Sequence, residues 1–346
     1  MRTGIAAAGI AALLVLVGCS GGDDGSRGEG TTGASTQQSG GSAADLARLL
    51  PDAALDSMII TFGDVGEIAA ANEVPVPADG DVDGLVAWAE TGNGPGVPVL
   101  LPGQFRGDAL ASHDEYADEL GVSLWGAQRY AGLDGPPTHV ALLEGDDPGE
   151  SISGALGDPD GDIWAIGDEG RIDLTQRSVA RPTGEAVRLA VTESGYAIIA
   201  SSETLARAGA AESPTLAVGE LGAVIDQLAD EEIVSGVIAS ADDGSSAPEV
   251  TGVGFGVDGA HGDGVFARLV LGYGDDERAV NTVDDVREFF TDGATSTGQA
   301  WSDLLTVADV KAAGGTVVVE ATFAEGQSPQ SLVTLIMQGP TGLPGR

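Results

Sequence analysis

Acidic side chains alternate along one short segment in the spacing of a calcium-binding loop. Asp79, Asp81 and Asp83 take its first, third and fifth positions, a glycine takes the sixth, and Glu90 takes the twelfth. Calcium binds six to eight oxygen ligands, and a glycine at the sixth position permits the sharp turn that gathers them around one ion. The predicted ligands are Asp79, Asp81, Asp83, the backbone carbonyl of Leu85 and the bidentate carboxylate of Glu90.

These residues resemble an EF-hand loop, whereas the sequence on either side departs from that family. Pro75 and Pro77 exclude an entering helix, and Gly92 and Pro95 end any exiting helix early. Two interpretations therefore stay open. The segment either holds a structural calcium ion that orders the loop, or it is a solvated acidic loop that caps a short helix.

No other pattern in the sequence indicates catalysis or a cofactor. The histidines His113, His139 and His261 lie far apart, and none has metal-ligand spacing. A Ser-His-Asp triad needs no closeness in sequence, so they leave nucleophilic catalysis open without indicating it. Gly254–Gly259 fits GxGxxG, but the next residues favour a strand over the helix that a dinucleotide site requires, so we predict a glycine-rich hairpin. P-loop, HExxH and GxSxG patterns are absent. We predict no catalytic residue and a non-enzymatic protein.

An apolar segment, Ile5–Gly18, has the length of the hydrophobic region of a secretory signal peptide and is too short to span a bilayer. It ends in Leu16, Val17 and Gly18, directly before Cys19, the single cysteine. This ending resembles the lipobox of bacterial lipoproteins with a type II signal peptide. The resemblance implies a diacylglyceryl thioether on Cys19, cleavage before Cys19, and usually an acyl chain such as palmitate on the new amine.

The predicted location follows from this resemblance. Two or more acyl chains form a stable membrane anchor. We therefore expect a lipoprotein on the extracytoplasmic face of the cell membrane, whose partner is the lipid bilayer through the acylated Cys19.

The charge and the cysteine count exclude several classes of protein. The 346 residues carry a formal net charge of −39, which argues against nucleic acid as a partner because phosphate binding needs clustered Lys and Arg. A single cysteine excludes an intramolecular disulfide and a cysteine-rich zinc site. The remaining partner class is a protein or a small molecule that the sequence does not identify.

The chain divides into five segments by composition. They are a signal peptide (1–18), a lipidated Gly/Ser-rich tether (19–44), a first half (45–212) with an insertion near 73–136, a second half (213–339) and a flexible tail (340–346). Both halves mix strands rich in β-branched residues with capped helices, and consecutive strands are common. This pattern predicts an α+β fold with antiparallel or mixed sheets and packed helices.

The halves also share a sequence pattern that suggests an internal duplication. Leu50–Asp64 aligns without gaps on Leu228–Asp242, an offset of 228 − 50 = 178 residues. A later junction, Gly145 to Asp147, recurs at Gly274 to Asp276, an offset of 274 − 145 = 129 residues. The smaller second offset predicts about fifty extra residues in the first half. The alternative is that strand-Asp-helix junctions recur because Asp is a good N-cap.

Two further segments, Tyr116–Leu124 and Trp301–Leu305, resemble uncharacterised lipoproteins of high-GC Gram-positive bacteria. That resemblance implies one large exported α+β body and no particular chemistry. We therefore expect a membrane-anchored extracytoplasmic protein that binds a partner or is associated with the envelope. The alternatives are a solute-binding lipoprotein of a transport system, which a cleft between two lobes would favour, and an extracytoplasmic hydrolase, which a pocket with Ser, His and acid groups within hydrogen-bond reach would favour.

Overall fold

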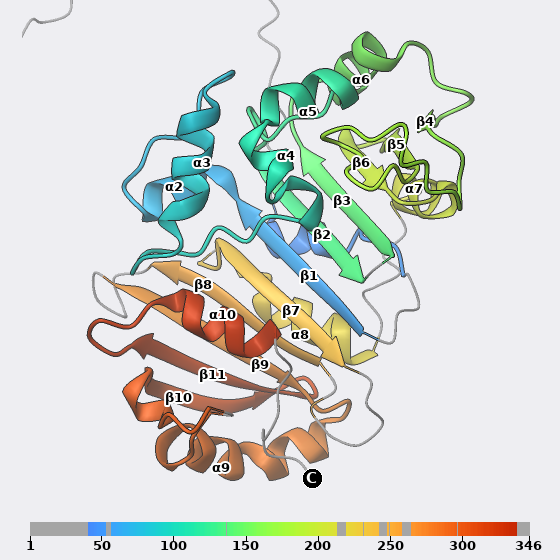
Figure 1. Ribbon diagram of the computed structural model, residues 1–346. Helices are drawn as coiled ribbons and strands as arrows, with labels where there is room; N and C mark the ends of the chain where they lie inside the picture. Colours follow the sequence, from blue (N-terminus) through green and yellow to red (C-terminus); the bar gives the residue numbers. More distant parts are fainter. Residues whose placement is uncertain are drawn as a thin grey trace, which may run out of the picture. The chain divides into compact units, whose positions relative to one another are not determined.

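A computed structural model describes residues 41–52, 57–135, 137–212, 219–230, 232–241, 248, 250–257, 264–295 and 297–337 (Figure 1). These residues belong to one compact unit that begins at Gly40. An eleven-stranded antiparallel sheet runs through it, with helices on both faces. The α+β prediction is confirmed.

The strands and helices have the following bounds. The strands are β1 (Ser57–Asp64), β2 (Arg129–Gly135), β3 (Thr138–Glu144), β4 (Trp164–Ile166), β5 (Val187–Val191), β6 (Tyr196–Ala200), β7 (Ser235–Ala241), β8 (Val250–Val257), β9 (Val265–Gly272), β10 (Leu305–Ala313) and β11 (Thr316–Phe323). The helices are α1 (Ala43–Ala47), α2 (Val65–Ala71), α3 (Val82–Thr91), α4 (Asp108–Ala111), α5 (His113–Leu120), α6 (Pro148–Leu156), α7 (Glu203–Ala210), α8 (Gly219–Leu228), α9 (Asp276–Asp292) and α10 (Pro329–Met337), with short 3-10 turns at Gly103–Phe105 and Trp301–Asp303.

The two halves repeat one strand order. The sheet order is β10-β11-β9-β8-β7-β1-β2-β3-β6-β5-β4. Read outward from the centre, the first half runs β1-β2-β3-β6-β5 and the second runs β7-β8-β9-β11-β10, with β4 as an extra edge strand. A different order in the two halves would have contradicted an internal duplication, so the topology supports it.

The centre of the sheet joins equivalent positions of the two halves. Ile60 of β1 pairs with Ile238 of β7, and these residues are 178 positions apart, which is the offset of the sequence repeat. Behind them, Arg48 reaches Asp226 of α8 at 2.6 Å, again across a separation of 178 residues. The halves are therefore related by an approximate two-fold axis through the β1–β7 pair.

Successive side chains of a strand point to opposite faces of the sheet, so each face has its own hydrophobic core. On β3, Val140 and Leu142 face one core, and Ala141 and Leu143 face the other. The first core packs with α1, α7 and α8, and we call its side the back face. The second packs with α2 to α6, α9 and α10, and we call its side the front face. Burial on both faces explains why these strands are almost continuously apolar.

The closing helices of the two halves lie on opposite faces. Helix α7 contacts β5 and β6 and contributes Ala206 to the back core, whereas α10 contacts β7 and β8 and contributes Val333 to the front core. The connection from β7 to β8 is short, so α10 covers the front of these strands. In the first half, the long segment between β1 and β2 covers the front instead (Figure 1).

Two predicted boundaries need correction. The insertion was expected near 73–136, but β1 ends at Asp64 and β2 begins at Arg129, so it spans 65–128. The expected segment runs through the residues of β2, whose two glycines weaken the strand signal. The tether was expected to reach residue 44, but α1 begins at Ala43, and Ala43 and Ala44 are both buried.

Local signals agree with most of the predicted elements. Asp64, Ser202 and Asp275 cap α2, α7 and α9, since each side chain accepts a hydrogen bond from a backbone N–H three residues on. Ser112 also lies at a helix start, but its side chain makes no capping hydrogen bond. The described part of the GxGxxG segment, residues 254–257, lies in strand β8, which pairs antiparallel with β9, as the hairpin interpretation requires.

Candidate functional site

The acidic segment chosen for calcium forms the start of a helix. Asp81 is the N-cap of α3, and its Oδ1 accepts a hydrogen bond from the Gly84 N–H at 2.8 Å. Leu85 is buried within α3, and Glu90 lies in the last turn. At a rise of about 1.5 Å per residue, Glu90 is about 10 Å from Asp83 along the helix axis.

This arrangement corresponds to the second interpretation of the acidic segment, a loop that caps a short helix. Within the described part of the chain, no group of three or more His, Cys, Asp or Glu side chains is placed to hold a metal ion. Asp79, Asp81 and Asp83 lie at the start of α3, apart from Glu90. Calcium binding here stays a prediction, and it would require α3 to unwind.

The lipobox residues Leu16, Val17, Gly18 and Cys19 lie outside the described residues, as does His261. No helix among the residues that are described combines the length and the apolar character needed to cross a membrane. Lipidation at Cys19 therefore stays a prediction from the sequence.

His113 lies in a closed aromatic cluster. Its side chain is fully buried, and Nε2 accepts a hydrogen bond from the Leu124 N–H at 2.8 Å and lies 3.2 Å from Ser123 Oγ. The rings around it belong to Phe105, Tyr116 and Trp125. Burial lowers the pKa of His113 to about 4, and the Ala109 backbone and Asp114 oppose this only in part. A buried Ser-His contact without access to substrate is structural.

Because His113 is buried, we expect the protein to lose stability in acid. Its pKa is about 4 in the folded chain against 6.5 for the ordinary side chain, so the unfolded state alone binds a proton between these pH values. The free energy of unfolding should therefore fall by about 3 kcal/mol as the pH drops from 6.5 to 4. Urea unfolding of wild type and His113→Gln at several pH values checks this. Parallel pH curves for the two proteins would contradict it.

His139 lies beside two adjoining cavities. It pairs with Asp134 across the β2–β3 hairpin, and its backbone N–H donates to Ser201 Oγ at 3.2 Å. Cavities of about 240 and 700 Å³ share Asp134, His139 and Glu185 among their lining residues. Burial lowers the pKa of His139, although the charges of Asp134 and Glu185 act in the opposite direction. The ring is therefore neutral at pH 7.

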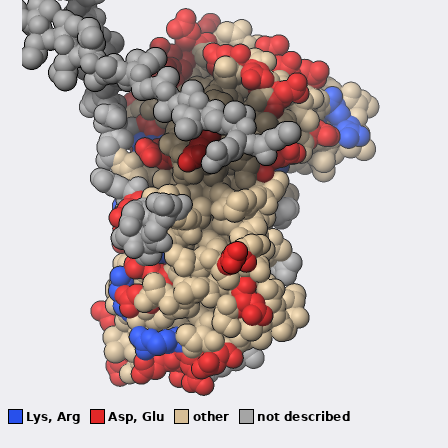
Figure 2. Space-filling model, turned by 90° about the vertical axis from the view of Figure 1, so that its left-hand side faces the viewer, with Lys and Arg blue, Asp and Glu red and all other residues tan. Residues whose placement is uncertain are grey.

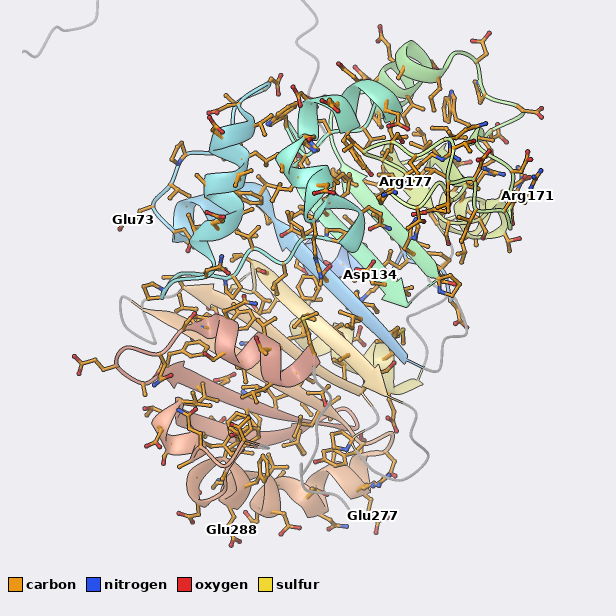
Figure 3. All side chains as sticks on the ribbon, viewed as in Figure 1. Glu73, Asp134, Arg171, Arg177, Glu277 and Glu288 are labelled. Carbon is orange, nitrogen blue, oxygen red and sulfur yellow. The ribbon has the colours of Figure 1, made fainter. Side chains whose placement is uncertain are left out.

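The carboxylates around the cavities are held by backbone donors. Asp134 Oδ2 accepts a hydrogen bond from the Gly103 N–H at 2.9 Å. Glu169 Oε2 accepts one from the N–H of Glu203, at the start of α7, at 3.1 Å. Figure 3 shows Asp134 at the end of β2, with Arg171 and Arg177 on the side of the β4–β5 segment, residues 167–186.

Two buried arginines shape the β4–β5 segment. Arg181 donates from Nε to the Glu185 carbonyl at 2.6 Å, and Arg188 donates to the carbonyls of Ile166 and Gly167 at 3.2 and 3.1 Å. Gly167 has a φ of 74°, and a Cβ there would lie 2.6 Å from the Arg181 guanidinium. These contacts fix the backbone that carries Glu185 to the cavities.

Two residues that line the smaller cavity have buried polar atoms without partners. Both amide atoms of Gln104 and the Oε2 of Glu185 are buried and make no hydrogen bond within the described residues. Such groups are normally satisfied by protein, water or ligand. The larger cavity adds apolar surface from Pro137, Leu205 and the exposed Ile172. The site therefore offers hydrogen-bond acceptors and a donor at one end and apolar contacts at the other.

This site has no pattern of its own in the sequence, because its parts are distant in the chain. Asp134 and His139 flank the turn of one hairpin, whereas Gln104 lies in the insertion and Glu185 follows β4. One signal was available, since Gly135 and Pro137 between two apolar runs indicate a hairpin. That hairpin pairs Asp134 with His139.

Comparison of the chain with protein-family models, curated proteins and solved structures finds no match.

Proposed function

We propose that this chain is an extracytoplasmic binding protein, anchored to the cell membrane by lipids on Cys19, that holds a small molecule in the two cavities at His139. The observation that carries the proposal is the pair of cavities of about 240 and 700 Å³ that share three titratable residues. Small-molecule sites usually occupy about 300–1,000 Å³ and combine apolar walls with a few convergent polar groups. The larger cavity is of this size.

The alternative functions have less support. A solute-binding lipoprotein would hold its ligand between two lobes, whereas one continuous sheet joins the two halves here. A hydrolase would need a nucleophile in contact with a base. Ser201 Oγ instead accepts the backbone N–H of His139, and no hydrogen bond from the His139 ring to a serine is found in the described part of the chain. Binding without catalysis is the simpler use of these residues.

The binding proposal is tested on residues 40–346, because this range forms one compact unit with both cores. A thermal-shift screen against small metabolites should find compounds that raise the melting temperature, since a ligand of the folded state stabilises it by mass action. Thr183→Trp places a large side chain at the larger cavity and should abolish the shift. Compounds that stabilise both proteins equally would argue against this cavity.

The anchor is tested separately with Cys19→Ala in the full chain. We expect the wild type to be labelled by radioactive palmitate and to partition into detergent, and the variant to lose both properties, because it has no thiol for diacylglyceryl transfer. Ser20→Ala, next to it in the sequence, serves as the control. Equal detergent partitioning of the Cys19→Ala protein would overturn the lipid anchor and leave the cavity proposal untouched.

A further inference from the structure

We infer that the His139 site selects an organic cation: an ammonium group held in the smaller cavity by Glu185, Asp134 and Gln104, with an apolar body in the larger cavity. This inference rests on the proposed binding function and adds the class of ligand. It depends on three observations, namely the sign of the charge, the unpartnered polar atoms and the division of the lining into polar and apolar parts.

The charge around the site is negative. The smaller cavity is lined by the carboxylates of Asp108, Asp134 and Glu185 and by one cationic side chain, Arg106. Arg106 donates from Nε to the Leu101 carbonyl at 2.6 Å, so part of its guanidinium is already engaged. The whole chain adds a net charge of −39. Such a site favours cations and repels carboxylates and phosphates.

The unpartnered atoms match an ammonium group. Glu185 Oε2 and Gln104 Oε1 are buried acceptors without a donor among the described residues. Asp134 accepts the Gly103 N–H at Oδ2 and lines both cavities. An ammonium has three donors and no acceptor, so it can satisfy such a set. Charge-assisted bonds of this kind are about twice as strong as neutral ones.

The larger cavity accommodates the rest of such a molecule. Its lining includes Pro137, Ala186 and Leu205, and Ile172 beside it is 69 % exposed. Exposed large aliphatic side chains are few among the described residues, and contact with a ligand would cover Ile172. Because Asp134, His139 and Glu185 border both cavities, one molecule can extend from the smaller cavity into the larger and more apolar one.

The test uses n-octylamine, which is an ammonium at neutral pH, with n-octanol and octanoate as neutral and anionic probes of similar length and ethylamine as a cation without an apolar body. Titration calorimetry on residues 40–346 at about 0.15 M salt, which screens long-range attraction, should give saturable binding of octylamine. Octanol should bind more weakly, and octanoate and ethylamine should give no saturable binding.

Variants that remove one negative charge test whether Glu185 contacts the ammonium group. Glu185→Gln keeps the shape of the side chain and removes its charge, so octylamine should bind about tenfold to a hundredfold more weakly, while octanol binding stays unchanged. Glu277→Gln makes the same charge change on α9, far from Asp134 in Figure 3, and should leave binding unaltered. Equal effects of both variants would show unspecific attraction to an acidic protein and would overturn the inference.

The experiments distinguish a wrong ligand class from a wrong binding site. If octanoate or octanol raises the melting temperature more than octylamine, and Thr183→Trp removes that effect, the cavity binds ligands but the inferred cation is wrong. If neither these probes nor the metabolite panel distinguish Thr183→Trp from the wild type, the proposed function itself is overturned.

Discussion

Replacing Arg129 with alanine is expected to lower the free energy of unfolding by about 3–5 kcal/mol, the usual cost of breaking one side of a buried ion pair. Arg129 is 7 % exposed, and its Nε lies 2.5 Å from Oε2 of Glu144, which is 12 % exposed. The same guanidinium donates to the carbonyls of Gly41 and Ser42, the first two described residues. The substitution takes the guanidinium away from the buried Glu144 carboxylate and removes its hydrogen bonds to the backbone just before α1. Urea unfolding followed by circular dichroism measures the loss.

A matched control separates the buried pair from arginine pairs in general. Arg171 lies 2.9 Å from Asp168, but both side chains are about three-quarters exposed, at 76 % and 75 %. Arg171→Ala should therefore change stability by less than about 1 kcal/mol. In addition, Arg129→Met combined with Glu144→Leu should recover much of the loss, because an apolar pair replaces buried charges at little cost. A similar small effect of both alanine variants would contradict the assigned role of Arg129.

Replacing Phe62 with alanine is expected to cost about 3–5 kcal/mol, as for other fully buried aromatic side chains. Phe62 is fully buried on the back face and lies opposite Gly236 in the β1–β7 pair. A Cβ added at Gly236 would lie 2.3 Å from the end of the Phe62 ring, so the ring covers the backbone of the neighbouring strand. Its removal leaves a cavity at the junction of the two halves. The midpoint of guanidinium unfolding, at unchanged slope, reports the effect.

The pair also predicts a clear departure from additivity. Gly236→Ala alone should destabilise by about 1–3 kcal/mol, because the new methyl group clashes with the ring. In the Phe62→Ala background the clash is gone and the methyl group fills part of the cavity, so Gly236→Ala should be neutral or stabilising there. Additive losses in this double-mutant cycle would show that the ring and the glycine do not interact.

The predictability of the fold followed the strength of the local signals. Strands rich in β-branched residues, such as Thr316–Phe323, and helices that follow a capping Asp or Ser carry local signals that indicate their structure. The sequence of strand β2, RYAGLDG, carries no such signal, because it contains two glycines and an arginine. Pairing with β1 on one side and β3 on the other stabilises β2 as a strand, although its own residues do not favour one.

The candidate site was less predictable for a geometric reason. The cavities at His139 are lined by residues from the insertion, the β2–β3 hairpin and the β4–β5 segment, and the fold of the sheet brings these together. Local spacing instead favoured the acidic segment at Asp79, where the alternation arises at a helix start. In a chain with 54 acidic residues, a pattern of carboxylates has little specificity.

The β1–β7 junction has a consequence for how the chain assembles. In the described sheet, β1 and β7 form the one strand pair that joins the halves, and 235 − 64 = 171 positions separate the end of β1 from the start of β7. During synthesis, β1 is made long before β7, so its edge stays unpaired. The β7 strand of a second copy of the chain can pair with this edge in the same register. Two copies that exchange halves would keep every native contact across this seam, so crowded nascent chains face an intertwined dimer as the natural competitor of the monomer.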